Sequence, residues 1–317
     1  MRRRRFLHSA PALAGVFAGA GLSGCAAPPQ VIELLRAWPA AVPSHATAGT
    51  VPFYPQEDYE CGPAALAMAA SAAGRTVRPE QLVAQVYVPG RQGALQPEML
   101  AAGRRQGLVA YPLVPRLDAV LREVAAGHPV IVFQNLSLPA FPVWHYAVVI
   151  AYDRETGLRL HSGRTSDMEI SWDAFERTWA RGGYWAMVLL PPQRLPATVE
   201  PERYLGAVAA LERSDPRAAQ AAYARALEAW PGHRLALFGA GNAAYALGQL
   251  EAAATSLRAA VDRYPDFADA WHNLAQVRLD QGRRQEAEAA IERAVALGGS
   301  RLSRYLELRQ QIGAGGR

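Results

Sequence analysis

The chain has 317 residues, half of them hydrophobic and 19% charged, so it is long enough for two globular domains and too apolar for wholesale disorder. Its formal net charge is +5, but four of the 33 basic residues stand at positions 2–5, and the first 24 residues contain no acid. The rest of the chain carries a net charge of only +1. A nearly neutral body excludes the broad basic surface that nucleic-acid binding requires.

The first 24 residues have the pattern of an export signal. Four arginines at 2–5 form a positive n-region, and residues 10–22 form an apolar stretch that is too short to remain as a membrane span. Residues 22–25 read Leu-Ser-Gly-Cys, which resembles the lipobox of bacterial lipoproteins. That resemblance implies cleavage before Cys25 and lipidation of its thiol. Residues 3–7, Arg-Arg-Arg-Phe-Leu, also resemble a twin-arginine signal.

This signal predicts a lipoprotein of the cell envelope that faces the periplasm, and Ala26 and Ala27, which are not acidic, favour the outer membrane. The alternative is an uncleaved N-terminal anchor. Residues 25–47, rich in Pro and Ala, are expected to form a tether. Only two cysteines are present, so lipidation of Cys25 leaves Cys61 unpaired in an oxidising compartment. This favours a reactive thiol at Cys61 over a buried, inert one.

Residues 48–193 combine helical and strand patterns. Ala- and Leu-rich or Pro-initiated segments predict helices at 61–73, 79–87, 97–106 and 117–126. Runs of β-branched and aromatic residues predict buried strands at 130–133, 145–151 and 184–190. Because the helices come first and the strands later, the sequence predicts an α+β domain.

Residues 198–312 are almost wholly helical and repeat with a period of 34 residues. Matching positions are Ala219, Ala253 and Ala287; Ala226, Ala260 and Ala294; Tyr223, Leu257 and Ile291; Gly248 and Gly282; Pro231 and Pro265; Leu237 and Trp271. The pattern resembles the tetratricopeptide repeat, in which small residues let paired helices approach closely. It predicts an all-α solenoid of about three repeats that binds a protein partner or a substrate segment.

Cys61 stands where the first predicted helix begins, so free backbone N–H groups and the helix dipole favour its thiolate. Gly62 is expected to let substrate approach the backbone, and Pro63 suits a first-turn position that needs no N–H. Gln56, five residues before the cysteine, is placed to aim an amide at the point that the Cys61 N–H faces. Together these two groups predict an oxyanion hole with two donors.

Residues 56–66, Gln-Glu-Asp-Tyr-Glu-Cys-Gly-Pro-Ala-Ala-Leu, resemble the active-site signature of the bacteriocin-processing, double-glycine leader peptidases, a papain-like family. Residues 144–150, Trp-His-Tyr-Ala-Val-Val-Ile, resemble the histidine motif of the same family, in which a His opens a strand. The resemblance covers about residues 50–190. It implies a papain-like fold with Cys61 as nucleophile, His145 as general base and acid, and Gln56 as oxyanion donor.

The family usually places an Asp followed by Pro on the next strand, where it orients the His. Here residues 160–163 read Leu-His-Ser-Gly and contain no carboxylate, so Ser162 takes the Asp position, with His161 one register away. A Ser can accept a hydrogen bond from the imidazole but cannot stabilise an imidazolium as an anion does. Other candidate orienters are Asp153, expected in a turn; Asp167; and Asp173, expected to cap a helix near residue 174.

The sequence therefore predicts a lipid-anchored cysteine peptidase, and the resemblance implies cleavage after small residues. One alternative is a peptidase fold that has lost catalysis and serves as a binding adaptor, which the missing Asp favours. Another is transfer of the acyl group to an amine. No phosphate-binding glycine loop, zinc-spaced Cys/His set or basic-aromatic pattern is present, so no cofactor, metal or nucleic acid is expected.

Overall fold

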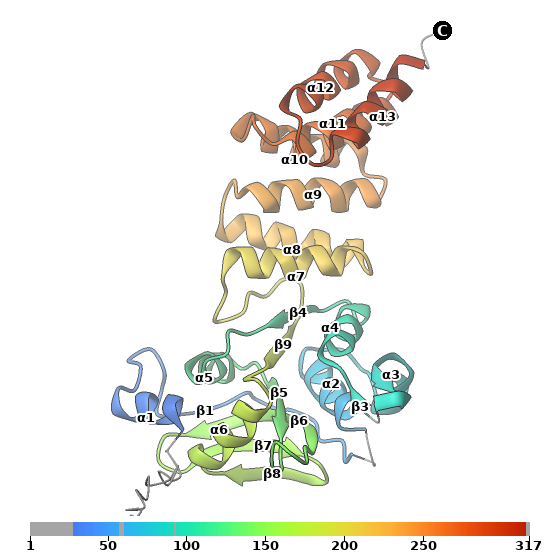
Figure 1. The fold of residues 1–317 in the computed structure, drawn as a ribbon. Helices are drawn as coiled ribbons and strands as arrows, with labels where there is room; N and C mark the ends of the chain where they lie inside the picture. The colour runs from blue at the N-terminus through green and yellow to red at the C-terminus, as the bar shows by residue number, and fades with distance from the viewer. Residues whose placement is uncertain (1–27, 57–59, 92, 315–317) are drawn as a thin grey trace, which may run out of the picture.

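The computed structural model describes residues 28–56, 60–91 and 93–314 (Figure 1). The predicted signal sequence and the predicted lipidation site, Cys25, lie outside these ranges. Within them, no helix is both long enough and apolar enough to cross a membrane.

A seven-stranded antiparallel sheet forms the centre of the N-terminal domain. Its strands lie in the order β4-β9-β5-β6-β7-β8, and β1 pairs with the C-terminal half of β6. The strands are β1 His45–Thr47, β4 Val109–Pro112, β5 Val130–Asn135, β6 Trp144–Asp153, β7 Gly157–Ser162, β8 Thr165–Ile170 and β9 Ala186–Leu190. A separate two-stranded sheet joins β2 Tyr87–Val88 to β3 Gly93–Ala94, with the 3-10 turn η1 Pro89–Arg91 between them.

Helices cover both faces of the sheet, so its central strands are buried on both sides. In β5, Ile131 packs with the helices of one face, whereas Val130 and Val132 pack with those of the other, as strand geometry requires. The first face is covered by α2 Cys61–Ala72, α3 Pro79–Val86 and α4 Gln96–Arg105, and the second by α1 Pro29–Arg36, α5 Leu117–Ala125 and α6 Trp172–Arg181. This arrangement confirms the predicted α+β class.

Helix α1 corrects the predicted tether at residues 25–47. Val31 and Leu34, three positions apart, bury one apolar face of α1 in the core. The fully buried carboxylate of Glu176 accepts hydrogen bonds from the backbone N–H groups of Gln30 (3.0 Å) and Val31 (2.6 Å). An anion at a helix N-terminus satisfies donors that have no partner inside the helix. From residue 29 onward, this segment is therefore part of the domain.

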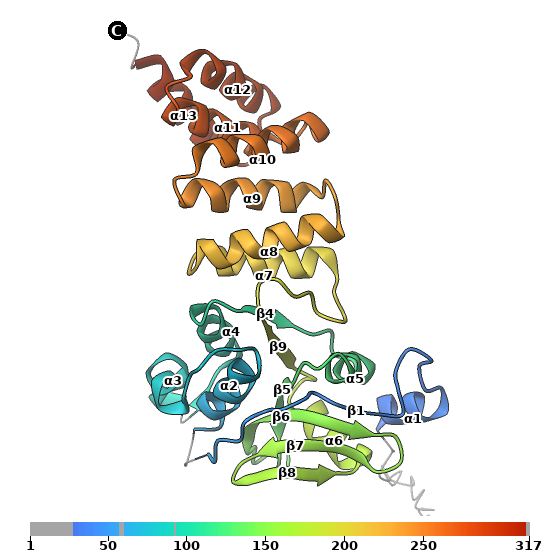
Figure 2. The same cartoon turned by 180° about the vertical axis from the view of Figure 1, so that it is seen from behind.

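Within residues 201–314, seven helices stack away from the sheet (Figures 1 and 2). They are α7 Pro201–Glu212, α8 Pro216–Ala229, α9 Arg234–Ala246, α10 Leu250–Arg263, α11 Ala268–Asp280, α12 Arg284–Leu297 and α13 Leu302–Ala314. Small residues let neighbouring helices approach closely: a Cβ added to Gly239 of α9 would lie 2.1 Å from the Tyr223 ring of α8. The helices keep the predicted period and confirm the repeat architecture.

The two domains share one hydrophobic core, in which Tyr204 and Val208 of α7 join the cluster that includes Tyr111 of β4. Figures 1 and 2 both show α7 lying beside β4. The Tyr111 hydroxyl donates to the Thr198 carbonyl and accepts from the Glu200 N–H, each at 3.1 Å. The segment between the domains is thus held against the sheet and does not behave as a free linker.

Glu123 of α5, a fully buried carboxylate, holds the same segment. It accepts from the Ala197 N–H (3.1 Å), from the N–H and hydroxyl of Thr198 (2.8 and 2.6 Å), and lies 2.7 Å from His128 Nδ1. A buried carboxylate with this many donors is well satisfied. The orientation of the repeats therefore depends on it.

We expect Glu123→Gln to lower the free energy of unfolding by about 1–3 kcal/mol, because the amide cannot accept from all of these donors and leaves some of them buried without a partner. Denaturant unfolding measures the change. The matched control is Glu228→Gln, an exposed carboxylate whose loss should cost less than about 1 kcal/mol. Equal stability of the two variants would contradict this account of the junction.

Candidate active site

Cys61 is the first residue of α2, and its side chain is half-buried against the core of that face. Helix α2 is apolar on all sides, and every residue from Gly62 to Ala70 is buried. A helix of this kind belongs in a protein interior, so its N-terminus is fixed relative to the sheet. The side chain of the N-cap residue, Glu60, makes no capping hydrogen bond to this N-terminus.

The Cys61 sulfur lies beside the strand that carries the predicted catalytic histidine. Burial raises the pKa of the thiol, whereas the backbone N–H groups of Tyr146, Gly62 and Cys61 itself act to lower it. Tyr146 directly follows His145 in β6, so the structure brings the two motifs together at one end of the sheet. Burial is the larger effect, and the thiol is therefore protonated at neutral pH.

His145 is the second residue of β6, and its Nε2 lies 2.9 Å from the Ser162 hydroxyl. Burial lowers the pKa of this histidine to about 4, because nothing offsets the cost of desolvating the charged ring. The imidazole is therefore neutral at pH 7. In the tautomer whose Nε2–H donates to the Ser162 oxygen, Nδ1 is the nitrogen that can accept a proton.

Gln56 is 7% exposed, and its amide nitrogen Nε2 has no hydrogen-bond partner among the described residues. Its backbone N–H donates to the Gly163 carbonyl (3.1 Å), which ties this residue to the turn after Ser162. A buried amide without a partner is rare in proteins and costs free energy unless something uses it. The two N–H donors of the Gln56 amide are thus free among the described residues, and their oxyanion role stays a prediction.

The fold requires glycine at positions 163 and 62 for two different reasons. Gly163 has φ +59°, a conformation that proline cannot adopt, so the turn after Ser162 differs in backbone shape from an Asp-Pro turn. Gly62 corrects a prediction: it is buried, and a Cβ there would lie 2.5 Å from the Ala94 Cβ. Its small size therefore serves packing against β3 rather than access of substrate.

The other candidate orienters are engaged elsewhere. Asp153 accepts from the N–H groups of residues 155 and 156 in a turn, as predicted, and Asp167 pairs with Arg159. His161 bonds the Val51 carbonyl and the Asp167 N–H. Ser171, not Asp173, caps α6 through the Ala174 N–H. Ser162 is thus the side chain that contacts the His145 ring.

An exposed apolar loop lies directly before His145 and was not predicted. It joins β5 to β6, and the large exposed side chains here are Leu136, Leu138, Phe141 and Val143 of the loop and Trp144, the first residue of β6. Phe141 is 76% exposed, and Trp144 stacks on Phe133 with ring centroids 5.2 Å apart. Apolar side chains clustered on a surface mark a binding site for apolar groups. In the sequence, residues 136–144 are rich in large apolar side chains but lack helix or strand periodicity, so an exposed apolar loop could have been predicted there.

No group of three or more His, Cys, Asp or Glu side chains in the described ranges is arranged to hold a metal ion.

Comparison with known proteins identifies both domains. Residues 49–187 match the Peptidase_C39 like family, and residues 204–266 and 239–301 match the tetratricopeptide repeat. The chain therefore carries a Peptidase_C39-like domain followed by tetratricopeptide repeats. Among curated proteins, none matches the chain.

Solved structures match each domain separately. A double glycine motif protease from an AMS/PCAT transporter, solved with its leader peptide, is 24% identical; the match covers 45% of this chain and 93% of that one, with a TM-score of 0.36. The Sgt2 repeat domain from Aspergillus fumigatus is 28% identical over 34% of this chain and 74% of its own, with a TM-score of 0.31. The first repeat domain of Spaghetti, bound to an HSP90 peptide, is 16% identical over 33% and 82%, also at 0.31.

We expect Ser162→Asp to raise the pKa of His145 from about 4 by about 1–3 pH units, because a carboxylate at Nε2 stabilises the imidazolium. NMR titration of the histidine ring measures it. Ser162→Asn is the matched control, since it has the same shape without the charge. A His145 pKa that stays the same in all three proteins would show that residue 162 does not govern this ring.

Proposed function

We propose that this chain is an exported, lipid-anchored cysteine peptidase in which Cys61 attacks a peptide carbonyl and His145 transfers the protons. The observation that carries the proposal is the buried Gln56 amide, which has no partner among the described residues and whose backbone is bonded to Gly163, next to the Ser162 that contacts His145.

The geometry supports a mechanism that starts from a neutral pair. His145 Nδ1 accepts the thiol proton as the Cys61 sulfur bonds to the carbonyl carbon, and the Gln56 amide and the Cys61 N–H receive the developing oxyanion. The imidazolium then gives its proton to the leaving amine, and a thioester remains. Water attacks the thioester with His145 again as base, which releases the acid and restores the thiol.

Because no carboxylate contacts His145, its imidazole is a weak base before the reaction starts, and the Cys61 thiol is a weak acid. Ser162 fixes the ring by one hydrogen bond but adds no charge, so burial keeps His145 neutral down to about pH 4. The ion pair forms only as the sulfur attacks an electrophile, and transition-state contacts must supply its stabilisation. Gln56 therefore matters more here than in a site with a preformed thiolate.

The exposed loop before His145 suits a substrate with apolar side chains near the cleaved bond. Leu138, Phe141 and Trp144 offer the contact surface, and a substrate that covers them removes apolar area from water. Family resemblance suggests small residues at the bond itself. The repeats would hold a protein partner or a distant segment of the substrate.

Lipidation of Cys25 would place the peptidase domain close to the membrane, because α1, which begins at Pro29, is packed into that domain. The protein would then lack a long tether. Detergent-phase partitioning of the protein from cells tests the anchor: Cys25→Ser should move the protein to the aqueous phase, and unchanged partitioning would rule out lipidation at this residue.

A second candidate function is a binding module without catalysis. The contact of His145 with a Ser in place of a carboxylate favours it, as does the raised pKa of Cys61. Such a module would use the apolar loop and the repeats to hold a peptide without cutting it.

Turnover of fluorogenic peptides with a Gly-Gly cleavage site, and of a broader peptide library, tests the proposal. Cys61→Ala should abolish turnover, and Gln56→Glu should lower kcat on the order of a hundredfold, because a carboxylate of the same shape cannot donate to the oxyanion. Gln56→Glu should leave the binding of an uncleavable peptide nearly unchanged. Peptide binding without turnover in the unmodified protein would favour the second function.

A further inference from the structure

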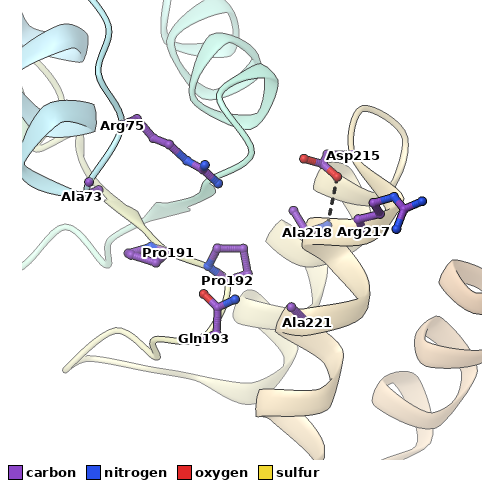
Figure 3. A pocket seen from close by; sticks show the side chains of 10 residues that line it. Ala73, Arg75, Pro191, Pro192, Gln193, Asp215, Arg217, Ala218 and Ala221 are labelled. Carbon is purple, nitrogen blue, oxygen red and sulfur yellow. Dashed lines mark hydrogen bonds between the residues drawn. The ribbon is translucent and has the colours of Figure 1, made fainter.

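A cleft of about 540 Å³ lies where the N-terminal domain meets the first repeat, and it contains neither Cys61 nor His145 (Figure 3). Its walls are the loop after α2, the residues that follow β9, and the first turns of α8; they are lined by Ala73, Gly74, Arg75, Pro191, Pro192, Gln193, Asp215, Arg217, Ala218 and Ala221. Figure 3 shows Arg75 on one side of the cleft and Asp215 and Arg217 on the other. Both domains thus contribute charged side chains to it.

Arginines gather around this cleft from four elements. Arg75 and Arg217 line it, Arg104 lies in the last turn of α4, and Arg213 follows α7. Burial and the nearby charges of Arg213 and Arg105 lower the pKa of Arg104, so the Arg104 guanidinium lies close to those two cations. Like charges brought together by a fold favour an anion between them.

These arginines have no carboxylate partners within the described residues. None of Arg75, Arg104, Arg213 and Arg217 forms a salt bridge there, although most other arginines of the repeats do. Asp215 is the acid of the cleft, and its Oδ1 already accepts from the Ala218 N–H to cap α8. Arg75 donates to the Gly107 carbonyl, a neutral partner. Asp215 offsets part of this charge, because its Oδ2 and the Arg75 guanidinium both lie beside Gly107, but the two arginines of the lining still outnumber its one acid.

A second hollow adjoins this cleft. This hollow of about 200 Å³, lined in part by His128 and Arg194, shares Ala73, Gly74 and Pro191 with the first. Because they share these residues, the two hollows adjoin, and we call them together the groove; Arg75 and Arg217 line its first hollow and Arg194 its second. A groove of this shape fits an extended chain better than a compact ion. Its described lining contains no Trp, Tyr or Phe on which a nucleic-acid base would stack.

We infer that this groove binds an extended acidic peptide segment, whose carboxylates pair with Arg75 and Arg217 at one end and Arg194 at the other. Guanidinium groups bind carboxylates through two parallel hydrogen bonds, which gives selectivity for Asp and Glu side chains. The segment would belong to a substrate or partner protein. Because the groove lies apart from Cys61, binding there does not depend on the proposed peptidase activity.

Fluorescence anisotropy with a short labelled peptide of alternating Glu and Ala tests this inference, against a matched peptide of alternating Gln and Ala. The full chain carries Cys61→Ala throughout, so that no probe is cleaved. The Glu peptide should bind more tightly than the Gln peptide and should weaken with added salt. The double variant Arg75→Gln with Arg217→Gln should lower its affinity about tenfold.

The control variant, Arg36→Gln with Arg304→Gln, removes the same charge from exposed arginines in α1 and α13 and should leave the affinity within about twofold. Equal binding of the two peptides, or equal losses in the two double variants, would overturn the inference. Displacement of the Glu peptide by micromolar inorganic phosphate would overturn the peptide assignment and identify a small-anion site. If the double variant at Arg75 and Arg217 fails to fold, the salt dependence of Glu-peptide binding to the protein with an intact groove tests the inference: affinity that does not fall with added salt would overturn it.

Discussion

The packing of α2 against β6 is the contact on which the candidate site depends. Because α2 is apolar on every side, it is held in the interior, and its first residue, Cys61, is fixed beside the backbone of Tyr146. That same contact buries the sulfur and His145, which raises the pKa of the thiol and lowers that of the imidazole. The fold that aligns the two groups therefore also opposes their ionisation, and the oxyanion donors must offset this cost during the reaction.

Two buried glutamates join the parts of the chain. Glu176 holds the N-terminus of α1 on the domain, and Glu123 holds the segment that leads into the repeats. In each case a carboxylate satisfies backbone N–H groups that would otherwise be buried without partners. As a result the repeats and the N-terminal segment are fixed relative to the sheet, and a basic groove forms at the junction with walls from both domains.

Much of this organisation was predictable from sequence because it depends on local patterns. The start of α2 at Cys61, the strand around His145 and the 34-residue period of the repeats all appear as periodic or motif signals. The family motif predicted the contact of Ser162 with His145. It did not predict that the His145 imidazole is neutral, because burial is a property of the whole fold. The predictions lacked β4 and β8, which are short strands with little periodicity of their own, and α1, whose apolar spacing lies in a Pro- and Ala-rich segment that was interpreted as a tether. The groove with the arginines is lined by residues more than 100 positions apart in the sequence, and no local sequence pattern predicts such a site.

The central claim is that His145 accepts the proton of the Cys61 thiol, and alkylation of the thiol by iodoacetamide across pH tests it most directly. His145 is neutral above about pH 4 and the thiol pKa is raised, so the rate should rise steadily from neutral into alkaline pH, without the plateau in mildly acidic solution that a preformed thiolate gives. At neutral pH, His145→Ala should slow labelling about tenfold or more, whereas His45→Ala, at an exposed position, should not. A labelling rate that is the same with and without the His145 imidazole would contradict the claim.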